Sequence, residues 1–282
     1  MSEQSKSFLS ERRGFLAAAL ATGFALAVRP VAASTIVTDS EGLEVGPAFV
    51  ERGDVELPVY VARPANASGR LPVVVVVQEI FGVHEHIQDL CRRLAKLGYL
   101  AIAPDLYFRQ GDPRKYPEIE ALQREVVSKV PDAQVMADLD GTVAWAVAHG
   151  GDGARVALTG FCWGGRIAWL YAAHNPELKA IAAWYGRVEG KASDNTPTQP
   201  VDVAAQLKVP VLGLYGGKDQ GIPLDGVERM RVAIKRSGEP SRIVVYEDAG
   251  HGFNADYRPS YHRAAAQDGW AEMLKWFRSH GV

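Results

Sequence analysis

Apolar and polar positions along the chain form a clear alternating pattern from Leu71 onward. Short apolar runs alternate there with longer segments in which apolar residues recur at helical spacing. Val73 to Val77 is an unbroken β-branched run, as expected of a strand that is buried on both faces. The alternation predicts an α/β fold with a mostly parallel central sheet and helices on both faces.

The predicted elements follow one another without an internal repeat or an interdomain linker. Ahead of them, Ala48 to Glu51 and Leu57 to Ala62 predict two strands around the turn signal Arg52-Gly53-Asp54. Residues 34–282 are therefore expected to form a single domain. The strands predicted after Val77 are Tyr99 to Ala103, Arg155 to Leu158, Ala180 to Trp184, Val211 to Tyr215 and Arg242 to Tyr246. The predicted helices are Glu85 to Leu97, Pro117 to Lys129, Ala133 to His149, Arg166 to Ala173, Asp225 to Ser237 and Tyr261 to His280.

Residues 1–33 have the features of an export signal. Paired arginines, Arg12-Arg13, precede the uncharged apolar stretch Leu16 to Val28, and Val31-Ala32-Ala33 has the small residues of a cleavage site. The alternatives are a membrane anchor and a chance Arg-Arg pair, but the stretch is shorter than the roughly 20 residues that span a bilayer. The segment resembles a twin-arginine signal peptide, an address that the twin-arginine machinery reads on proteins exported already folded. We expect cleavage after Ala33, a periplasmic or secreted protein and no stable membrane span in the mature chain.

Composition and charge exclude several classes of protein. With 282 residues, 47% of them hydrophobic, the chain suits one large globular domain. A net charge of −2 gives no basic field, so no nucleic-acid partner is expected. The two cysteines do not make a disulfide framework, and Cys91 falls on the apolar stripe of a predicted helix, where a core cysteine fits. His84 and His86 lie at a helix start without metal-ligand spacing, and we predict no metal and no cofactor.

The stretch Gly160-Phe161-Cys162-Trp163-Gly164-Gly165 joins a predicted strand to a predicted helix. It has the pattern of the Gly-x-Ser-x-Gly nucleophile elbow, with sulfur in place of the hydroxyl. Residues beside a nucleophile on such a strained turn must carry little bulk, which explains the glycines. The N-terminus of the following helix carries a partial positive charge, which favours a thiolate. Taken alone, the motif could also be a buried cysteine beside a glycine-rich turn.

Two further candidates follow later strands. Asp219 ends the run Tyr215-Gly216-Gly217-Lys218-Asp219, and His251 lies in Ala249-Gly250-His251-Gly252. Singly, they could be a turn residue and a loop residue. The chain order of nucleophile, acid and histidine is that of α/β-hydrolases, and each residue follows a predicted strand. In this triad His251 takes the thiol proton and later activates water, while Asp219 orients the imidazole and stabilises its charged form.

The predicted strand Val73 to Val77 leads into Gln78-Glu79-Ile80-Phe81-Gly82. This loop is where α/β-hydrolases place the second oxyanion donor, which we assign to the backbone N–H of Ile80. The first donor is then the backbone N–H of Trp163, and the two stabilise charge on the carbonyl oxygen. Glu79, at the mouth of an apolar strand, is expected to have a raised pKa and to exchange a proton with the thiol. The alternative for Glu79 is a surface or salt-bridging carboxylate.

Five motifs in register resemble the dienelactone hydrolase family. They are Gln-Glu-Ile-Phe-Gly at 78–82, Ala-Pro-Asp-Leu-Tyr at 103–107, Gly-Phe-Cys-Trp-Gly-Gly at 160–165, Tyr-Gly-Gly-Lys-Asp at 215–219 and Ala-Gly-His-Gly-Phe at 249–253. The likeness runs from about Val50 to the C-terminus. It implies a single-domain α/β-hydrolase that opens the lactone ring of dienelactone, 4-carboxymethylenebut-2-en-4-olide, to give maleylacetate.

The resemblance also implies roles for individual residues. Carried over by motif, the triad is Cys162, His251 and Asp219, and the family's glutamate falls on Glu79, which is held to bond the resting thiol and to help ionise it. Because the substrate carries a carboxylate, the family binds it with arginines, and Arg109 falls at one of those positions.

The chain departs from the family at the second arginine. It is expected four residues after the catalytic histidine, where this chain has Ala255, with Arg258 three residues further on. The sequence alone therefore favours a thiol hydrolase of a small lactone or ester. A broad exported carboxylesterase with the same triad is the alternative in substrate. A non-catalytic or redox-sensing protein, in which Cys162 is oxidised or disulfide-linked, is the alternative in class.

Overall fold

The run Val73–Val77 lies in the middle of an eight-stranded sheet and is completely buried. The structure is a computed structural model, and it describes residues 35–282. The predicted signal segment, its paired arginines and its cleavage site after Ala33 lie outside the described residues. Neighbouring strands pack their apolar residues into the same hydrophobic core as this run. The burial of the run on both faces follows from its uninterrupted β-branched sequence.

The sheet has the strand order β1-β2-β4-β3-β5-β6-β7-β8. The pairs from β4 through β8 are parallel, whereas β1 pairs with β2 and β2 with β4 in the antiparallel sense. The prediction of a mostly parallel α/β sheet is therefore confirmed. The strands are β1 (Leu43–Arg52), β2 (Val55–Pro64), β3 (Leu71–Val77), β4 (Leu100–Pro104), β5 (Gly151–Phe161), β6 (Ala180–Trp184), β7 (Val211–Gly216) and β8 (Arg242–Tyr246).

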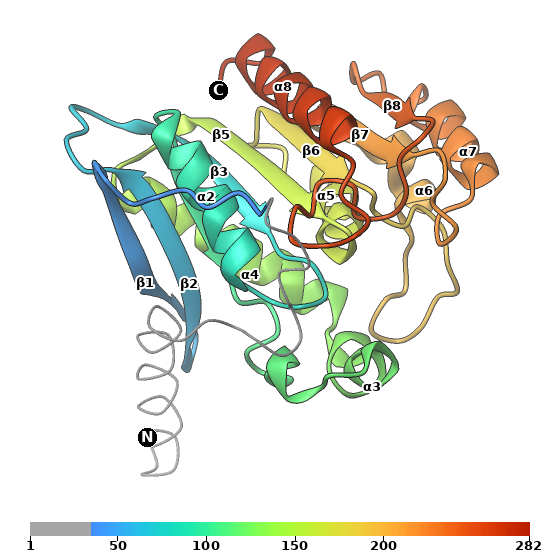
Figure 1. Ribbon diagram of the computed structural model, residues 1–282, viewed down its shortest axis with the longest axis horizontal. Helices are drawn as coiled ribbons and strands as arrows, with labels where there is room; N and C mark the ends of the chain where they lie inside the picture. Colours follow the sequence, from blue (N-terminus) through green and yellow to red (C-terminus); the bar gives the residue numbers. More distant parts are fainter. Residues whose placement is uncertain (1–34) are drawn as a thin grey trace.

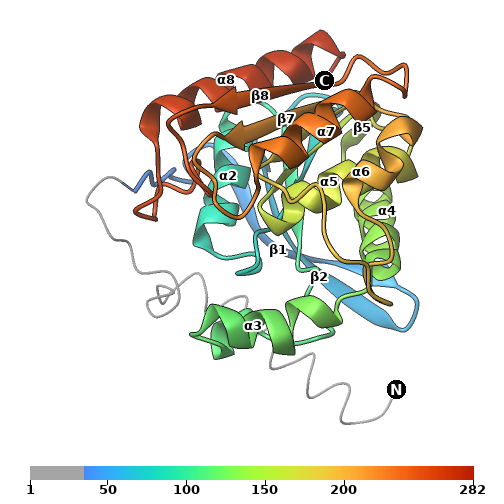
Figure 2. The same ribbon diagram turned by 90° about the vertical axis from the view of Figure 1, so that its right-hand side faces the viewer.

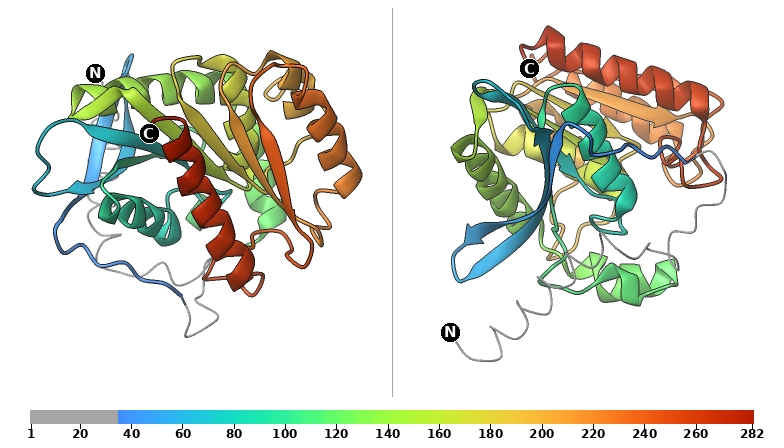
Figure 3. Two further views of the ribbon diagram at one scale, coloured as in Figure 1. Left: turned by 90° about the horizontal axis from the view of Figure 1, so that it is seen from above. Right: turned by 60° about the vertical axis from the view of Figure 1, so that its left-hand side comes forward.

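Helices cover both faces of the sheet. Figure 1 and the two views of Figure 3 show α2 and α8 on one face and α4, α5 and α7 on the other. Figure 2 shows α3 set apart from the sheet, beyond the ends of the strands. The α-helices are α2 (Glu85–Lys96), α3 (Ile119–Glu125), α4 (Asp132–Ala148), α5 (Trp163–His174), α6 (Pro200–Val203), α7 (Leu224–Ile234) and α8 (Arg263–Ser279). Short 3₁₀ turns are η1 (Pro113–Lys115), η2 (Val127–Lys129) and η3 (Ala204–Gln206).

The two strands predicted before the α/β region form a hairpin that is longer than expected. β1 and β2 turn at Gly53, whose φ of 63° is readily reached only by glycine. The turn predicted from Arg52-Gly53-Asp54 is therefore confirmed. Because β1 and β2 pair with each other along their length, both strands extend beyond their most apolar residues.

Helix boundaries differ from the predictions at two places that matter for the site. α5 starts at Trp163, three residues before the predicted start at Arg166, because Gly164 and Gly165 lie inside the helix despite their low helix propensity. The segment predicted as one helix over 117–129 is a short α3 followed by the 3₁₀ turn η2. Because of this early start, the N-terminus of α5 lies directly after Cys162.

Parallel strands end at the same edge of the sheet, and the candidate residues lie just beyond those ends. Glu79 follows β3, Cys162 follows β5, Asp219 follows β7 and His251 follows β8. This is the edge at which open α/β sheets bind their ligands. The topology alone thus gathers residues that are far apart in the sequence.

Candidate active site

Cys162 occupies a tight turn between β5 and α5. Its backbone has φ 54° and ψ −112°, a conformation that a residue other than glycine adopts at a cost of about 1–3 kcal/mol. The glycines around it are required by close backbone contacts. A Cβ at Gly160 would overlap the carbonyl oxygen of Gly164, and one at Gly165 would overlap that of Trp184. The motif therefore packs β5, α5 and β6 closely enough to present the thiol at the sheet edge.

The structure places His251 within hydrogen-bond distance of both other predicted triad residues, Cys162 and Asp219. Nε2 of His251 lies 3.1 Å from Sγ of Cys162, and its Nδ1 lies 2.7 Å from Oδ2 of Asp219. The other carboxylate oxygen, Oδ1 of Asp219, accepts from the backbone N–H groups of Gly221 at 2.8 Å and Ile222 at 3.1 Å. The carboxylate is thus fixed from behind by the backbone while it orients the imidazole.

His251 lies between two groups that favour its charged form. Burial lowers the pKa of the imidazole, but hydrogen bonds with Asp219 and Cys162 and their charges outweigh burial and raise it to about 10. The imidazole is therefore protonated at neutral pH. A protonated imidazole 3.1 Å from the sulfur stabilises a thiolate, which is the reactive form of a cysteine nucleophile.

The two predicted oxyanion donors lie on backbone segments that touch. A Cβ at Gly164 would lie 2.5 Å from the carbonyl oxygens of both Val77 and Gln78, so the end of β3 packs against the first turn of α5. Ile80 follows the first segment and Trp163 begins the second. Among the described residues, neither backbone N–H donates a hydrogen bond to a protein acceptor. Both donors are thus available to a ligand, and their role stays a prediction.

Glu79 is buried, but its environment differs from the one expected. Its Oε2 accepts a hydrogen bond of 2.7 Å from the phenol of Tyr257 and lies 3.4 Å from Nε2 of His84. Burial raises the pKa of this carboxyl, but His84, His86 and Tyr257 together outweigh burial and lower it to about 2. The predicted raised pKa is wrong, because the hydrogen-bond donors and charges around the carboxylate outweigh its burial.

Aromatic side chains that the sequence analysis did not single out line the same region. Tyr185 follows β6 with a φ of 36°, and its ring centroid lies 5.4 Å from that of His251. Its buried phenol oxygen has no hydrogen-bond partner among the described residues. Tyr107 packs edge-on against Trp163 at 4.9 Å. These rings add apolar surface beside His251 and Trp163, and neither phenol oxygen has a hydrogen-bond partner among the described residues.

The predicted substrate-binding arginine is bound by a carboxylate of the protein. The guanidinium of Arg109 donates to both carboxylate oxygens of Asp138 on α4, at 2.6 and 3.1 Å. Ala255 is completely buried. Arg258 instead lies with its guanidinium carbon 5.5 Å from the ring centre of Phe81, and it has no anionic partner within ion-pair distance in the described part of the chain. Arg258, unlike Arg109, therefore lies next to the 78–82 loop without a carboxylate partner among the described residues.

The remaining predictions concern features outside the triad. Cys91 is fully buried in α2, and burial raises the pKa of its thiol, so the core interpretation of this residue is confirmed. Both cysteines are free. Within residues 35–282 no group of three or more histidine, cysteine, aspartate or glutamate side chains could hold a metal ion. None of the helices in this part of the chain has the length and apolar content to cross a membrane.

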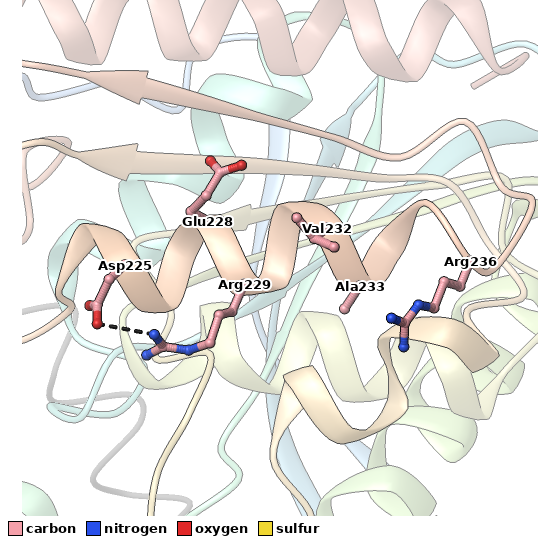
Figure 4. A pocket seen from close by; sticks show the side chains of 6 residues that line it. All are labelled: Asp225, Glu228, Arg229, Val232, Ala233 and Arg236. Carbon is pink, nitrogen blue, oxygen red and sulfur yellow. Dashed lines mark hydrogen bonds and ion pairs between the residues drawn. The ribbon is translucent and has the colours of Figure 1, made fainter.

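A surface depression lies on the outer face of α7 (Figure 4). Its charged side chains include Asp225 and Arg229, which pair with each other at 3.0 Å. No triad residue lines this depression. The candidate active site is therefore the edge of the sheet beyond β3, β5, β7 and β8 and not this depression.

Comparisons with known proteins agree with the fold and identify the family. The family described as "Dienelactone hydrolase family" matches residues 57–281. A protein of Escherichia coli K12 named "Putative carboxymethylenebutenolidase" is 56% identical over 260 residues, which cover 92% of this chain and 96% of that protein. One of the same name from Methylorubrum extorquens is 59% identical over 273 residues, covering 96% and 94%.

A solved structure gives the same result in three dimensions. The crystal structure of a "Putative Dienelactone Hydrolase" from Klebsiella pneumoniae superimposes with a TM-score of 0.83 at 60% identity, covering 84% of this chain and 98% of that one. The resemblance seen in the five sequence motifs is thus confirmed over most of the chain. This chain belongs to the dienelactone hydrolase family of carboxylic-ester hydrolases and has its α/β-hydrolase fold.

Proposed function

We propose that this protein hydrolyses a small lactone or ester through Cys162 as the nucleophile. The observation that carries the proposal is the continuous series of short contacts from Asp219 through His251 to the sulfur of Cys162. The strained elbow presents that sulfur at the ligand-binding edge of the sheet. A core cysteine would need neither a charged imidazole nor this backbone conformation.

The chemistry follows from the protonation states. The thiolate of Cys162 attacks the carbonyl carbon, and the oxyanion that forms is held by the backbone N–H groups of Ile80 and Trp163. The ester C–O bond breaks, and the leaving oxygen takes the proton of His251. His251, now neutral, removes a proton from water, which attacks the thioester, and the C–S bond breaks to return the thiolate and release the acid.

Dienelactone is the first substrate to test, with maleylacetate as the product. Support comes from family membership and from relatives named as carboxymethylenebutenolidases. Its carboxylate requires a cationic partner, for which the sequence predicts Arg109. Since Arg109 is engaged by Asp138, we assign the main contact to Arg258, which lies over Phe81 without an anionic partner among the described residues.

A broad carboxylesterase is the second candidate. It is favoured by Ala255 at the position of the family's second arginine and by the bidentate contact of Arg109 with Asp138. Both features reduce the positive charge available to a substrate carboxylate. A neutral ester would need none of that charge.

The deciding experiment uses purified protein comprising residues 34–282, with Cys162→Ala as the control. Dienelactone and a neutral short-chain aryl ester are assayed side by side, and free thiols are counted in the same preparation. A strong preference for the lactone supports the first candidate, and comparable or better turnover of the ester supports the second. If Cys162→Ala is as active as the wild type, or if Cys162 is isolated blocked, the thiol-hydrolase proposal is wrong.

Export is a separate proposal that rests on residues 1–33 alone. Replacing the pair Arg12-Arg13 by two lysines keeps the charge but removes the twin-arginine signature. We expect the wild-type protein in the periplasmic or secreted fraction and the replaced protein in the cytoplasm. Equal distribution of the two proteins would contradict export through the twin-arginine machinery.

A further inference from the structure

Glu79 and Tyr257 connect two loops that carry different parts of the active site. Glu79 precedes Ile80, the assigned oxyanion donor, and Tyr257 lies six residues after His251 in the loop that follows β8. The phenol of Tyr257 donates to Oε2 of Glu79 at 2.7 Å, and both side chains are buried. This hydrogen bond is therefore a direct link between the oxyanion loop and the histidine loop.

The ring of Tyr257 is held by its own surroundings. Its centroid lies 5.2 Å from that of His84 and 5.0 Å from that of His86. Nδ1 of His86 lies 3.4 Å from Oδ1 of Asp256, whose other oxygen accepts from Arg93 of α2 at 2.5 Å. The start of α2 thus fixes the phenol that binds Glu79.

Four titratable groups face Glu79 from three parts of the chain. His84 and His86 come from the start of α2, Tyr257 from the loop after β8, and Tyr185 from the turn after β6. Burial raises the pKa of Glu79, and the first three groups outweigh it, so the carboxyl remains ionised at neutral pH. An ionised carboxylate only accepts hydrogen bonds, which matches its contacts with the phenol and with His84.

The thiol has a different partner. Sγ of Cys162 is 3.1 Å from His251, while Oε2 of Glu79 is occupied by Tyr257 and His84. A carboxylate held in this way by two buried side chains cannot move to the sulfur without leaving both donors unpaired, which is costly in a buried site. The contacts therefore separate two roles: His251 contacts the thiol, and Glu79 orders the oxyanion loop.

We propose that Tyr257 is a positioning residue that fixes Glu79, and with it the oxyanion loop, against the loop of His251. The hydrogen-bond partner of Cys162 is then His251 and not Glu79. The proposal rests on the proposed function, since it assigns a role within the same hydrolytic site. It differs from the role that family resemblance implies for Glu79, in which this carboxylate bonds and helps to ionise the thiol.

The test is Tyr257→Phe, which removes the phenol oxygen and keeps the ring. We expect kcat to fall about 10- to 100-fold with KM little changed, because a misplaced oxyanion donor weakens transition-state binding more than substrate binding. The acid limb of the kcat–pH profile is expected about one to two pH units higher, since Glu79 loses its short hydrogen bond and protonates more easily.

A Glu79→Gln change in the Tyr257→Phe background separates positioning from general damage. The amide that this change introduces cannot titrate in this range, so the upward displacement of the acid limb should disappear while kcat stays low. The matched control is Tyr171→Phe, which removes another buried phenol that donates to a carboxylate, Asp140 at 2.9 Å, on the α4–α5 side of the sheet. This control should leave kcat and the pH profile unchanged.

Several outcomes would overturn the proposal. An unchanged or increased kcat in Tyr257→Phe would show that Glu79 supports catalysis without its hydrogen bond to Tyr257. That result is expected if Glu79 instead contacts the thiol of Cys162. Persistence of the displaced limb in the Glu79→Gln double variant would assign that limb to another group. If Tyr257→Phe does not fold, His84→Leu removes the other contact of Glu79, at 3.4 Å, and should move the limb in the same direction by at least as much, because His84 lowers the pKa of Glu79 more than Tyr257 does. Activity that survives Cys162→Ala would instead overturn the proposed function.

Discussion

Nε2 of His251 lies 3.1 Å from Sγ of Cys162, although 89 positions separate the two residues in the sequence. The contact depends on the turn after β5, where Cys162 has a φ of 54°, and on Asp219, which holds the far side of the imidazole. The sulfur, the imidazole and the carboxylate therefore form one electrostatic unit. A conservative substitution at any one of these three residues is therefore expected to reduce activity more than it reduces stability.

Replacing the sulfur by oxygen tests the nature of the nucleophile. In Cys162→Ser the turn and the contact with His251 remain, but a serine hydroxyl does not ionise beside an imidazolium as a thiol does. We expect kcat/KM to fall about 10³-fold or more, with the thermal unfolding temperature nearly unchanged. Steady-state kinetics combined with thiol titration and thermal unfolding measures these effects. Retention of most activity in the serine variant would argue against a thiolate mechanism.

Asp219→Asn tests the support of the imidazole. The amide oxygen can still accept from the backbone N–H groups of Gly221 and Ile222, so the loop should keep its conformation. The charge at 2.7 Å from Nδ1 is lost, and the amide can fix the wrong tautomer of His251. We expect kcat to fall about 10²- to 10⁴-fold. A variant that folds and retains full activity would remove Asp219 from the triad.

The glycines of the elbow can be tested through stability. A Cβ at Gly164 would lie 2.5 Å from two backbone carbonyl oxygens at the end of β3, where neither segment can yield easily. We expect Gly164→Ala to lower the free energy of unfolding by about 1–3 kcal/mol and to displace Cys162. Gly153→Ala in the same strand–turn–helix unit is the matched control, because its Cβ would meet Val147 at an ordinary 3.4 Å. Equal stability of the two variants would contradict the crowding argument.

Much of the fold and of the triad could be predicted from the sequence because the relevant signals are local. The β-branched run Val73–Val77 identifies its strand without reference to any other part of the chain, and Gly160, Gly164 and Gly165 identify the elbow. The order of Cys162, Asp219 and His251 along the chain then suffices to predict that they lie close together, because parallel strands end at one edge of the sheet.

The environment of Glu79 could not be predicted, because it is not local. Tyr257 is 178 positions away and belongs to none of the five motifs. His84 and His86 lack metal-ligand spacing in the sequence, but in the structure they pack around Tyr257 and lower the pKa of Glu79. Two histidines placed just after the Gln-Glu-Ile-Phe-Gly motif are the one sequence signal that could have indicated partners for its glutamate.

Substitutions of Arg258 and Arg109 are expected to have different effects, the first on substrate binding and the second on stability. Arg258→Gln should raise KM for a carboxylate-bearing lactone about 10- to 100-fold and leave a neutral ester nearly unaffected, because only the former offers an anion to the guanidinium. Arg109→Gln leaves Asp138 with a single cation, Arg52 at 3.6 Å, and should chiefly lower stability. KM values for both substrate classes and unfolding temperatures distinguish these effects. A selective loss of lactone affinity in Arg109→Gln would return the binding role to that residue.

The raised pKa of His251 predicts the alkaline side of the pH profile. The imidazolium that we propose as the proton donor to the leaving oxygen is present below a pH of about 10, so kcat/KM should fall as the pH rises through that value. The same shift adds stability that is fully present below the ordinary histidine pKa of 6.5 and is lost as the pH rises through about 10. In Asp219→Asn the largest contribution that raises this pKa is removed, so both transitions should move to lower pH. Rate profiles and denaturant titrations of the two proteins between about pH 6 and about pH 11 measure these transitions. An alkaline limb that stays in place in Asp219→Asn would show that a group other than His251 sets it.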